Sequence, residues 1–133
     1  MARYLLDSSA FLWAKTEPRR IKRKAFEEID NASNQLFVSL ATLWELAIKS
    51  SKGKLSIFEA MIAQKPLDII LSDSGFGLLD IGLDHVMTAY RLPYHHRDPF
   101  DRMIIAQALN ENLTLITSDA TFARYPGLSV LEA

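Results

Sequence analysis

The sequence predicts an α/β fold of three layers, in which helices cover both faces of a central, mostly parallel sheet of four to five strands. Short apolar runs alternate with segments of helical character along the chain, which is the pattern of strands joined by crossover helices. No repeat, low-complexity tract or linker interrupts that order. A length of 133 residues is typical of one domain, so we expect a single domain over residues 1–133.

The first part of the chain is expected to hold two strands and three helices. Pro18 suits the first turn of the second helix, with Ile21, Phe26 and Ile29 as its buried residues. The predicted strands are Arg3–Leu6 and Leu36–Val38. The predicted helices are Ser8–Lys15, Pro18–Ala32 and a third that is capped by Ser39 and ends near Gly53.

The third helix carries apolar residues at the spacing of one helical face. They are Leu40, Leu43, Trp44, Ala47 and Ile48. Such a stripe is expected to face the core. Glu45 lies well off the stripe, and Lys49 follows it at the spacing of a surface ion pair. Periodicity therefore predicts that Glu45 is solvated.

The second part of the chain is expected to alternate short helices and strands, with prolines at several boundaries. The predicted helices are Ile57–Gln64, Leu67–Leu71, Leu83–Arg91 and Pro99–Asn110, with a helical turn at Thr121–Arg124. The predicted strands are Gly77–Ile81, Leu113–Thr117 and Leu128–Leu131.

Acidic residues fall where predicted strands end and helices begin. Asp7 directly follows the first strand, and Asp119 follows a later one. Asp98 and Asp101 stand at the start of the Pro99–Asn110 helix. Because the carboxyl ends of parallel strands meet at one edge of a sheet, we expect these side chains to converge there.

Each of these acids also has a structural interpretation. We favour an N-cap role for Asp98, because Pro99 follows it at the first helical position. The helix dipole would favour a negative charge at Asp101, which would give this residue a structural role. The rest of that helix is apolar and therefore expected to be buried, so the Asp101 carboxylate would also lie at the mouth of a pocket. The structural alternative for Asp7 is a helix cap, and the one for Asp119 is an ordinary turn residue.

Converging carboxylates cannot all stay charged without a compensating cation. Oxygen ligands in a chain without cysteine favour Mg²⁺ or Mn²⁺. Zinc would want histidine, and the adjacent His95 and His96 cannot easily face one ion together. A carboxylate-held Mg²⁺ suits phosphodiester hydrolysis, because the metal activates water and stabilises charge on the phosphate.

Composition excludes several classes of protein. The absence of cysteine excludes disulfides and thiolate metal sites, and no stretch reads as a signal peptide or a membrane span, so we expect a cytoplasmic protein. The net charge of −1 does not point to nucleic acid. Basic residues are concentrated in two segments, Arg19 to Lys24 and Lys49 to Lys54. We interpret both as solvated helix faces, with one positive face beside the acidic pocket as the alternative.

Four stretches of the sequence, in order and over nearly the whole chain, resemble the motifs of PIN domains of the VapC toxin type. They are Leu5-Leu6-Asp7-Ser8-Ser9-Ala10-Phe11-Leu12-Trp13, residues 39–49 (Ser-Leu-Ala-Thr-Leu-Trp-Glu-Leu-Ala-Ile-Lys), His96-Arg97-Asp98-Pro99-Phe100-Asp101-Arg102 with the helix after it, and Leu115-Ile116-Thr117-Ser118-Asp119. The resemblance implies a PIN-like α/β/α sandwich with a metal site of four acids. These acids are Asp7, Glu45, Asp101 and Asp119, with Asp98 as a further candidate ligand. Glu45 would then face the site rather than solvent.

The same resemblance implies an Mg²⁺- or Mn²⁺-dependent endoribonuclease that forms a homodimer and is held inactive by a small antitoxin. Operator DNA would be reached only through the antitoxin, and no membrane partner is expected. Asp7 and Asp101 would make the most direct metal contacts, with Glu45 completing the shell. Asp119 would hold a second ion or the attacking water. Candidates for contact with RNA or antitoxin are Ser9, Arg97, Arg102 and Ser118; Arg102 has the alternative of an ion pair with Asp98.

Two other classes remain as alternatives. One is a non-catalytic RNA- or partner-binding module of the same fold, which the complete set of acids argues against. The other is an Mg²⁺-dependent phosphatase or phosphotransfer domain. The common phosphatase form needs a second Asp two positions after the first, where this chain has Ser9. A receiver-type domain needs paired acids near the first strand and a late strand-end lysine, and the sequence has neither.

Overall fold

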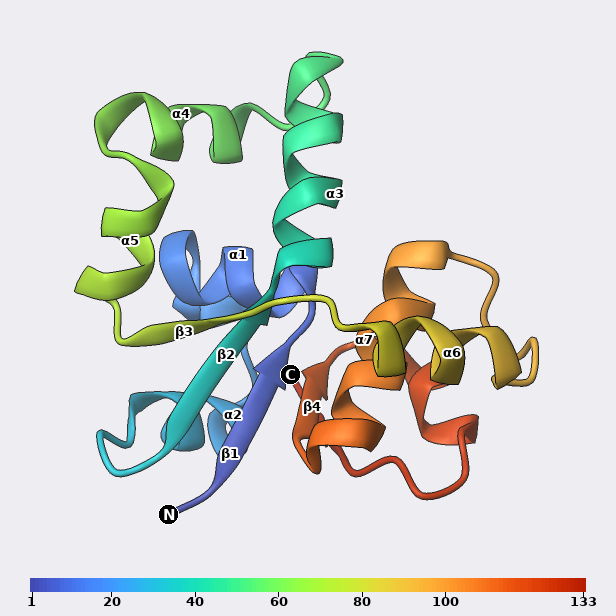
Figure 1. Ribbon diagram of the computed structural model, residues 1–133. Coiled ribbons are helices and arrows are strands. Elements are labelled where there is room, and N and C mark those ends of the chain that lie inside the picture. Colours follow the sequence, from blue (N-terminus) through green and yellow to red (C-terminus); the bar gives the residue numbers. More distant parts are fainter.

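A sheet of five parallel strands forms the centre of the computed structural model, which describes residues 1–133 (Figure 1). The strands are β1 (Arg3–Leu6), β2 (Gln35–Ser39), β3 (Phe76–Leu79), β4 (Thr114–Thr117) and β5 (Val130–Glu132). Their order across the sheet is β3-β2-β1-β4-β5. In the register of the central strands, Leu6 of β1 lies opposite both Val38 of β2 and Ile116 of β4. The predicted parallel α/β fold is confirmed.

Seven α-helices and two short 3₁₀ turns connect the strands. The helices are α1 (Ser8–Thr16), α2 (Arg23–Asp30), α3 (Leu40–Ser51), α4 (Ser56–Gln64), α5 (Leu67–Asp73), α6 (Leu83–Arg91) and α7 (Pro99–Glu111). The 3₁₀ turns are η1 (Pro18–Arg20) and η2 (Ala120–Arg124). None of the helices combines the length and apolar character that crossing a membrane requires.

The two faces of the sheet are buried against different helices, because successive residues of a strand point to opposite faces. On one face, Leu6 and Ile116 belong to an apolar cluster that contains Phe11 of α1, Leu46 of α3 and Phe58 of α4. On the other face, the cluster is built on the strand residues Leu5 and Leu115 and on side chains of α7 and η2, namely Ile104, Ile105 and Phe122. Each of these buried side chains contributes about 1.5–3 kcal/mol to folding. The fold is therefore a sandwich of three layers.

Side-chain caps fix the starts of the helices that approach the carboxyl edge of the sheet. Ser39 accepts a hydrogen bond from the backbone N–H of Ala41 and caps α3, as predicted. Asp98 accepts from the N–H groups of Phe100 and Asp101, at 2.8 and 3.2 Å, and caps α7 with Pro99 at the first helical position. The N-cap role predicted for Asp98 is thus confirmed.

The single helix predicted from Pro18 to Ala32 is wrong. Its first turn is the 3₁₀ turn η1, and α2 begins only at Arg23. Between them Ile21 has an extended backbone, which lets its side chain reach the core. Ala25 is buried within α2, whereas Phe26, which was expected to be buried, is 39% exposed. Burial of Ile21 in the core therefore interrupts the continuous helix that the sequence pattern predicts.

The apolar stripe predicted to bury α3 points largely away from the core. Leu43 is buried, but Leu40 is 43% exposed and Trp44 is 61% exposed. The buried face of α3 is instead made by Ala41, Thr42, Leu43, Glu45 and Leu46. This face packs toward α1 and α7, so the helix turns a polar residue inward and leaves large apolar side chains at the surface.

Candidate active site

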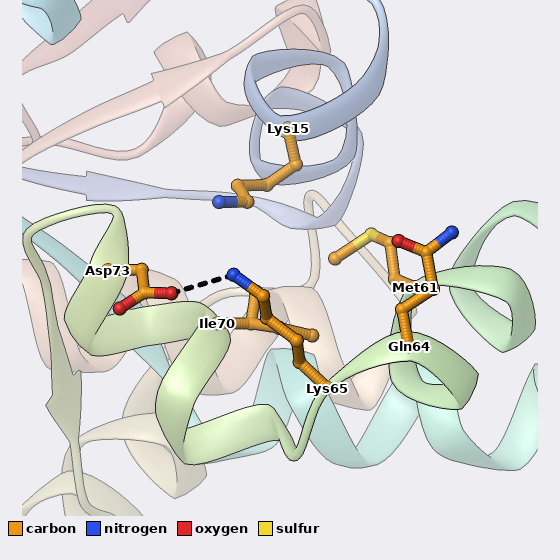
Figure 2. Close-up of a pocket in the computed structure, with 6 residues that line it drawn as sticks. All are labelled: Lys15, Met61, Gln64, Lys65, Ile70 and Asp73. Carbon is orange, nitrogen blue, oxygen red and sulfur yellow. Dashed lines mark hydrogen bonds and ion pairs between the residues drawn. The ribbon is translucent and has the colours of Figure 1, made fainter.

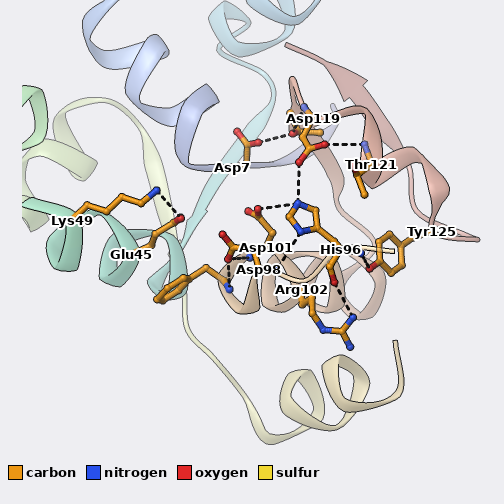
Figure 3. A network of polar contacts seen from close by, with 12 residues as sticks. Asp7, Glu45, Lys49, His96, Asp98, Asp101, Arg102, Asp119, Thr121 and Tyr125 are labelled. Atoms are coloured by element: carbon orange, nitrogen blue, oxygen red, sulfur yellow. Dashed lines mark hydrogen bonds and ion pairs between the residues drawn. The ribbon is translucent and has the colours of Figure 1, made fainter. Parts of the chain in front are cut away.

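Four acids from four different elements point toward one space at the carboxyl edge of the sheet (Figure 3). Asp7 directly follows β1, and Asp119 follows the neighbouring strand β4. Asp101 lies in the first turn of α7, and Glu45 lies on the buried face of α3. Burial is the main reason that the pKa values of Asp7 and Asp101 are raised, and repulsion from the neighbouring acids, Asp119 and Glu45 for Asp7 and Asp98, Glu45 and Asp7 for Asp101, adds to the rise. The acids are thus close enough to act on one another.

Asp7 is the most enclosed of these acids and is 6% exposed. Its Oδ1 accepts a hydrogen bond from the N–H of Ala10, and its Oδ2 accepts one from the hydroxyl of Thr117 at 2.5 Å. Burial raises the pKa of Asp7 more than these two hydrogen bonds lower it. Thr117 was not among the residues predicted for the site, although its place beside the end of β4 could have suggested it.

Asp101 is partly buried, and burial is the main reason that its pKa is raised to about 7. The nearby Asp98 raises this pKa further, and His96 opposes the rise. At neutral pH the carboxyl group is thus poised between its protonated and ionised forms. A divalent cation at this position would favour the ionised form.

His96 joins the two C-terminal acids of the site. Its Nε2 lies 2.9 Å from Oδ2 of Asp119 and 3.1 Å from Oδ2 of Asp101, while its Nδ1 accepts from the N–H of Asp98. Burial alone would raise the pKa of Asp119, but hydrogen bonds from Thr121 and His96 outweigh it and lower that pKa. Sequence reasoning set His96 aside because it is paired with His95. His95 in fact packs edge-on against Tyr125, outside the site.

Glu45 is 5% exposed, so the periodicity-based prediction that it is solvated is wrong. The expected ion pair with Lys49 does form, at 3.1 Å between Nζ and Oε2. Lys49 is itself half-exposed and covers the outer side of the Glu45 carboxylate. The helix thus holds an acid inward at the site while its charge partner reaches solvent.

The predicted contact residues fall into different surroundings. Ser9 is partly buried at the start of α1, whereas Arg97 and Ser118 are exposed. Arg102 is buried and donates to the carbonyl oxygens of Ala89 in the last turn of α6 and of three residues of the α6–α7 connection, Leu92, Pro93 and His96. It also stacks on the ring of Tyr94. Arg102 therefore forms no ion pair with Asp98 and fastens the loop that carries His96, which corrects its expected role as a phosphate or antitoxin contact.

The donor set fits a hard divalent cation. Most of its ligand atoms are carboxylate oxygens, and burial leaves two of the carboxyl groups with a raised pKa that a cation would relieve. Nε2 of His96 and the carboxylate oxygens of Asp101 and Asp119 all lie within 4.8 Å of one another. The residues present could therefore hold Mg²⁺ or Mn²⁺ at the carboxyl edge of the sheet.

A second group of metal-ligand type, Asp84, His85 and Glu111, has a structural role. Nδ1 of the buried His85 accepts from the N–H of Gly82 and so caps α6. Its Nε2 lies 2.9 Å from Oε2 of Glu111, which ties the start of α6 to the end of α7. Both ring nitrogens thus have protein partners, and we assign no chemistry to this group.

A hollow of about 190 Å³ lies between α1 and the α4–α5 pair, away from the acids (Figure 2). Its lysines point toward one another, but both already have partners. Lys65 forms an ion pair with Asp73 at 3.0 Å, and Lys15 donates to the hydroxyl of Ser74. Because both lysines are paired and the hollow lies away from the acids, we assign it no role in the chemistry of the acidic site.

Known proteins resemble this chain in sequence and in fold. The family model of the PIN domain matches residues 4–128. Among solved structures, the chain is similar to VapBC2 from Rickettsia felis bound to a DNA fragment from their promoter, with a TM-score of 0.73 and 24% identity over 98% of both chains. It is also similar to DNA-bound VapBC from Salmonella typhimurium (TM-score 0.65, 21% identity, 99% of this chain and 98% of that one).

A third similar structure is VapBC-1 from nontypeable Haemophilus influenzae, with a TM-score of 0.68 and 19% identity over 98% of this chain and 97% of that one. No match is found among curated proteins. At these identities the structures share the fold with this chain over nearly its whole length.

Proposed function

This chain belongs to the PIN domain family, and we propose that it is an Mg²⁺- or Mn²⁺-dependent endoribonuclease that acts as the toxin of a toxin–antitoxin pair in the cytoplasm. The observation that carries the proposal is the convergence of Asp7, Glu45, Asp101 and Asp119 from four separate elements. Burial of Asp7 and Asp101 raises the pKa of both carboxyl groups, and a divalent cation would compensate their negative charge. The complete acid set favours a catalytic site over a binding module.

In the proposed mechanism, Asp7 and Asp101 would hold the ion and Glu45 would complete its shell. When bound, Mg²⁺ or Mn²⁺ would supply stabilisation of negative charge on the phosphate and favour loss of a proton from the attacking water. In hydrolysis the water oxygen would bond to phosphorus while a P–O bond of the backbone breaks, and the departing oxygen would take a proton from solvent. Asp119, held by His96 and Thr121, is placed to orient the attacking water and accept its proton.

We propose a second copy of this chain as the partner of the apolar surface on α3. Leu40, Leu43, Trp44 and Ile81 line a hollow of about 410 Å³ there. Exposed apolar surface of this kind is typical of interfaces between proteins.

We further propose a small antitoxin as the partner that blocks the acidic site, because the similar structures are VapBC complexes. Operator DNA would be bound through that antitoxin.

The test is cleavage of a labelled single-stranded RNA by the purified protein in Mg²⁺ or Mn²⁺. Asp7→Ala should be inactive, EDTA should stop the wild type, and Asp84→Ala, which alters an exposed acid outside the site, should remain active. Sequencing of the RNA ends would define the cleavage motif. Equal loss of RNA with wild type and Asp7→Ala would reveal a contaminating nuclease and count against the proposal.

A further inference from the structure

A hollow of about 530 Å³ opens directly beside the acidic site, between the C-terminal half of α3 and the start of α7. The residues that line it are Glu45, Ile48, Lys49, Lys52, Lys54, Asp98, Pro99 and Phe100. We call it the α3–α7 groove. Its volume lies within the range of pockets that hold nucleotide-sized ligands. Because Glu45 belongs to both, the groove leads into the carboxylate site.

Two of the three lysines of the groove have no acidic partner. Lys49 is paired with Glu45, but Lys52 and Lys54 form no ion pair within 4.0 Å. Both are exposed, and Gly53 between them has a φ of 72°, which turns the chain where α3 ends. The groove therefore presents two uncompensated ammonium groups beside a site that is otherwise acidic. Lysine in this setting is a binder of phosphate.

The other basic segment differs from the groove in its place. Three of its five basic residues are paired, Arg20 with Glu17, Lys22 with Glu132 and Arg23 with Glu27, while Arg19 and Lys24 form no ion pair. In Figure 1, α2 and the end of α3 lie at opposite ends of the molecule. The two basic segments therefore do not form one positive face, and the Arg19–Lys24 segment lies away from the groove.

The hollow on the opposite side of the acidic site is lined by no basic residue. It has a volume of about 200 Å³ and is lined by Thr117, Ser118, Asp119, Ala120, Ala123, Val130 and Glu132. The cation nearest to its carboxylates by ion pairing, Lys22, is itself paired with Glu132. An RNA strand that places one phosphate at the acids thus meets two unpaired lysines on the α3 side and none among the residues that line this hollow.

We propose that the α3–α7 groove binds the RNA strand on one side of the cleaved phosphate, with Lys52 and Lys54 each contacting a backbone phosphate. This inference rests on the proposed function. Phe100 gives the groove an apolar wall against which a base can stack. The arrangement is one-sided: the strand is held on the flank toward α3 and left free on the flank toward Asp119.

The test measures binding of a fluorescein-labelled single-stranded RNA of mixed sequence by anisotropy, at several salt concentrations. An Asp7→Asn background with Mg²⁺ prevents cleavage. Lys52→Gln with Lys54→Gln should weaken binding about tenfold near 0.1 M salt and flatten the log–log salt slope by about 1.4, the value for two lost phosphate contacts on a single strand. Lys52→Arg with Lys54→Arg should keep the parent slope. The matched control, Arg19→Gln with Lys24→Gln, removes the two charges of the other basic segment that form no ion pair and should leave binding unchanged.

Three results would overturn the inference. They are a parent-like salt slope in the Lys52/Lys54 glutamine variant, an equal loss of RNA binding in the Arg19/Lys24 control, and a Lys52/Lys54 glutamine variant that binds polyglutamate more weakly but RNA as well as the parent. The last result would assign the groove to an acidic protein segment. Cleavage assays separate this inference from the proposed function. If the wild type cleaves RNA and the glutamine pair leaves kcat/KM unchanged, the groove assignment fails alone. If the wild type cleaves no RNA but the glutamine pair weakens RNA binding as expected, the nuclease proposal fails alone.

Discussion

Thr117 donates its hydroxyl hydrogen to Oδ2 of Asp7 at 2.5 Å, across the two neighbouring strands β4 and β1. The same hydroxyl oxygen accepts a hydrogen bond from the N–H of Asp119. One side chain thus ties two acids of the site together. Its hydrogen bond lowers the pKa of Asp7, in opposition to burial, and so favours the ionised form that a cation requires.

Thr117→Val should therefore weaken both folding and ion binding. The variant keeps the shape of the side chain but leaves Oδ2 of the buried Asp7 without a donor, which costs about 1–3 kcal/mol of stability. Thermal unfolding in EDTA and Mn²⁺ titration measure the two effects. Thr117→Ser keeps the hydroxyl and serves as the control. Wild-type ion affinity in the valine variant would contradict the proposed linkage.

Millimolar Mn²⁺ or Mg²⁺ should raise the Tm of the wild type, because a ligand that binds only the folded protein stabilises it by about 2.7 kcal/mol at a hundredfold excess over Kd. Asp101→Asn should largely abolish this rise. Asp84→Asn changes an acid of the second cluster and should retain it. An equal rise in all three proteins would place the ion elsewhere.

The stability of the metal-free protein should depend on pH through Asp101. Burial raises its pKa in the folded protein to about 7 from the usual 3.8 of an aspartate, so the stability linked to this group is full below pH 4 and is lost as the pH rises toward 7. In EDTA, the Tm of the wild type should therefore fall relative to that of Asp101→Asn between pH 5 and 8, by a few degrees. A difference in Tm that stays constant over this range would show that Asp101 does not titrate there.

Arg102→Lys should destabilise the protein by about 2–4 kcal/mol, because a lysine cannot reach the four carbonyl oxygens that the guanidinium group satisfies. Urea unfolding measures the loss. Arg97→Lys, at an exposed position in the same loop, should change stability by less than about 0.5 kcal/mol. Equal stability of the two variants would remove Arg102 from its assigned role.

Trp44→Lys should convert a dimer into a monomer, because a charge would lie within the apolar surface of α3. Sedimentation velocity measures the mass in solution. Phe26→Lys alters an exposed aromatic residue on α2 and should leave the mass unchanged. A monomeric wild type, or a dimeric Trp44→Lys variant, would contradict the proposed interface.

The elements that periodicity and turn residues predict best are those whose local preferences agree with the fold. β1 and α6 begin and end at the predicted residues, and Ser39 and Asp98 cap the helices expected of them. The parallel sheet followed from the alternation of strands and helices alone. Local chemistry and tertiary packing act in the same direction at these places.

On α3, the periodicity of the apolar residues predicts the wrong buried face. A helical wheel places the apolar residues inside, yet the helix buries Glu45 and exposes Trp44. The resemblance to a known family, and not the pattern of this chain, implied the position of Glu45. The contacts of His96 and Thr117 join segments distant in sequence. The place of Thr117 at the end of β4 could have suggested it for the site, whereas its bond to Asp7 and those of His96 to Asp101 and Asp119 follow only from the folded chain.

Because β1 and β4 are neighbours in the sheet, the contact between Asp7 and Thr117 spans 110 positions of the chain. The acidic site therefore stays incomplete during synthesis until the segment that carries α7, β4 and Asp119 has been made and β4 has docked against β1. A stop codon ahead of β4, or proteolytic removal of that segment, would take away Asp119 and the hydroxyl group that contacts Asp7 without touching Asp7 or Glu45.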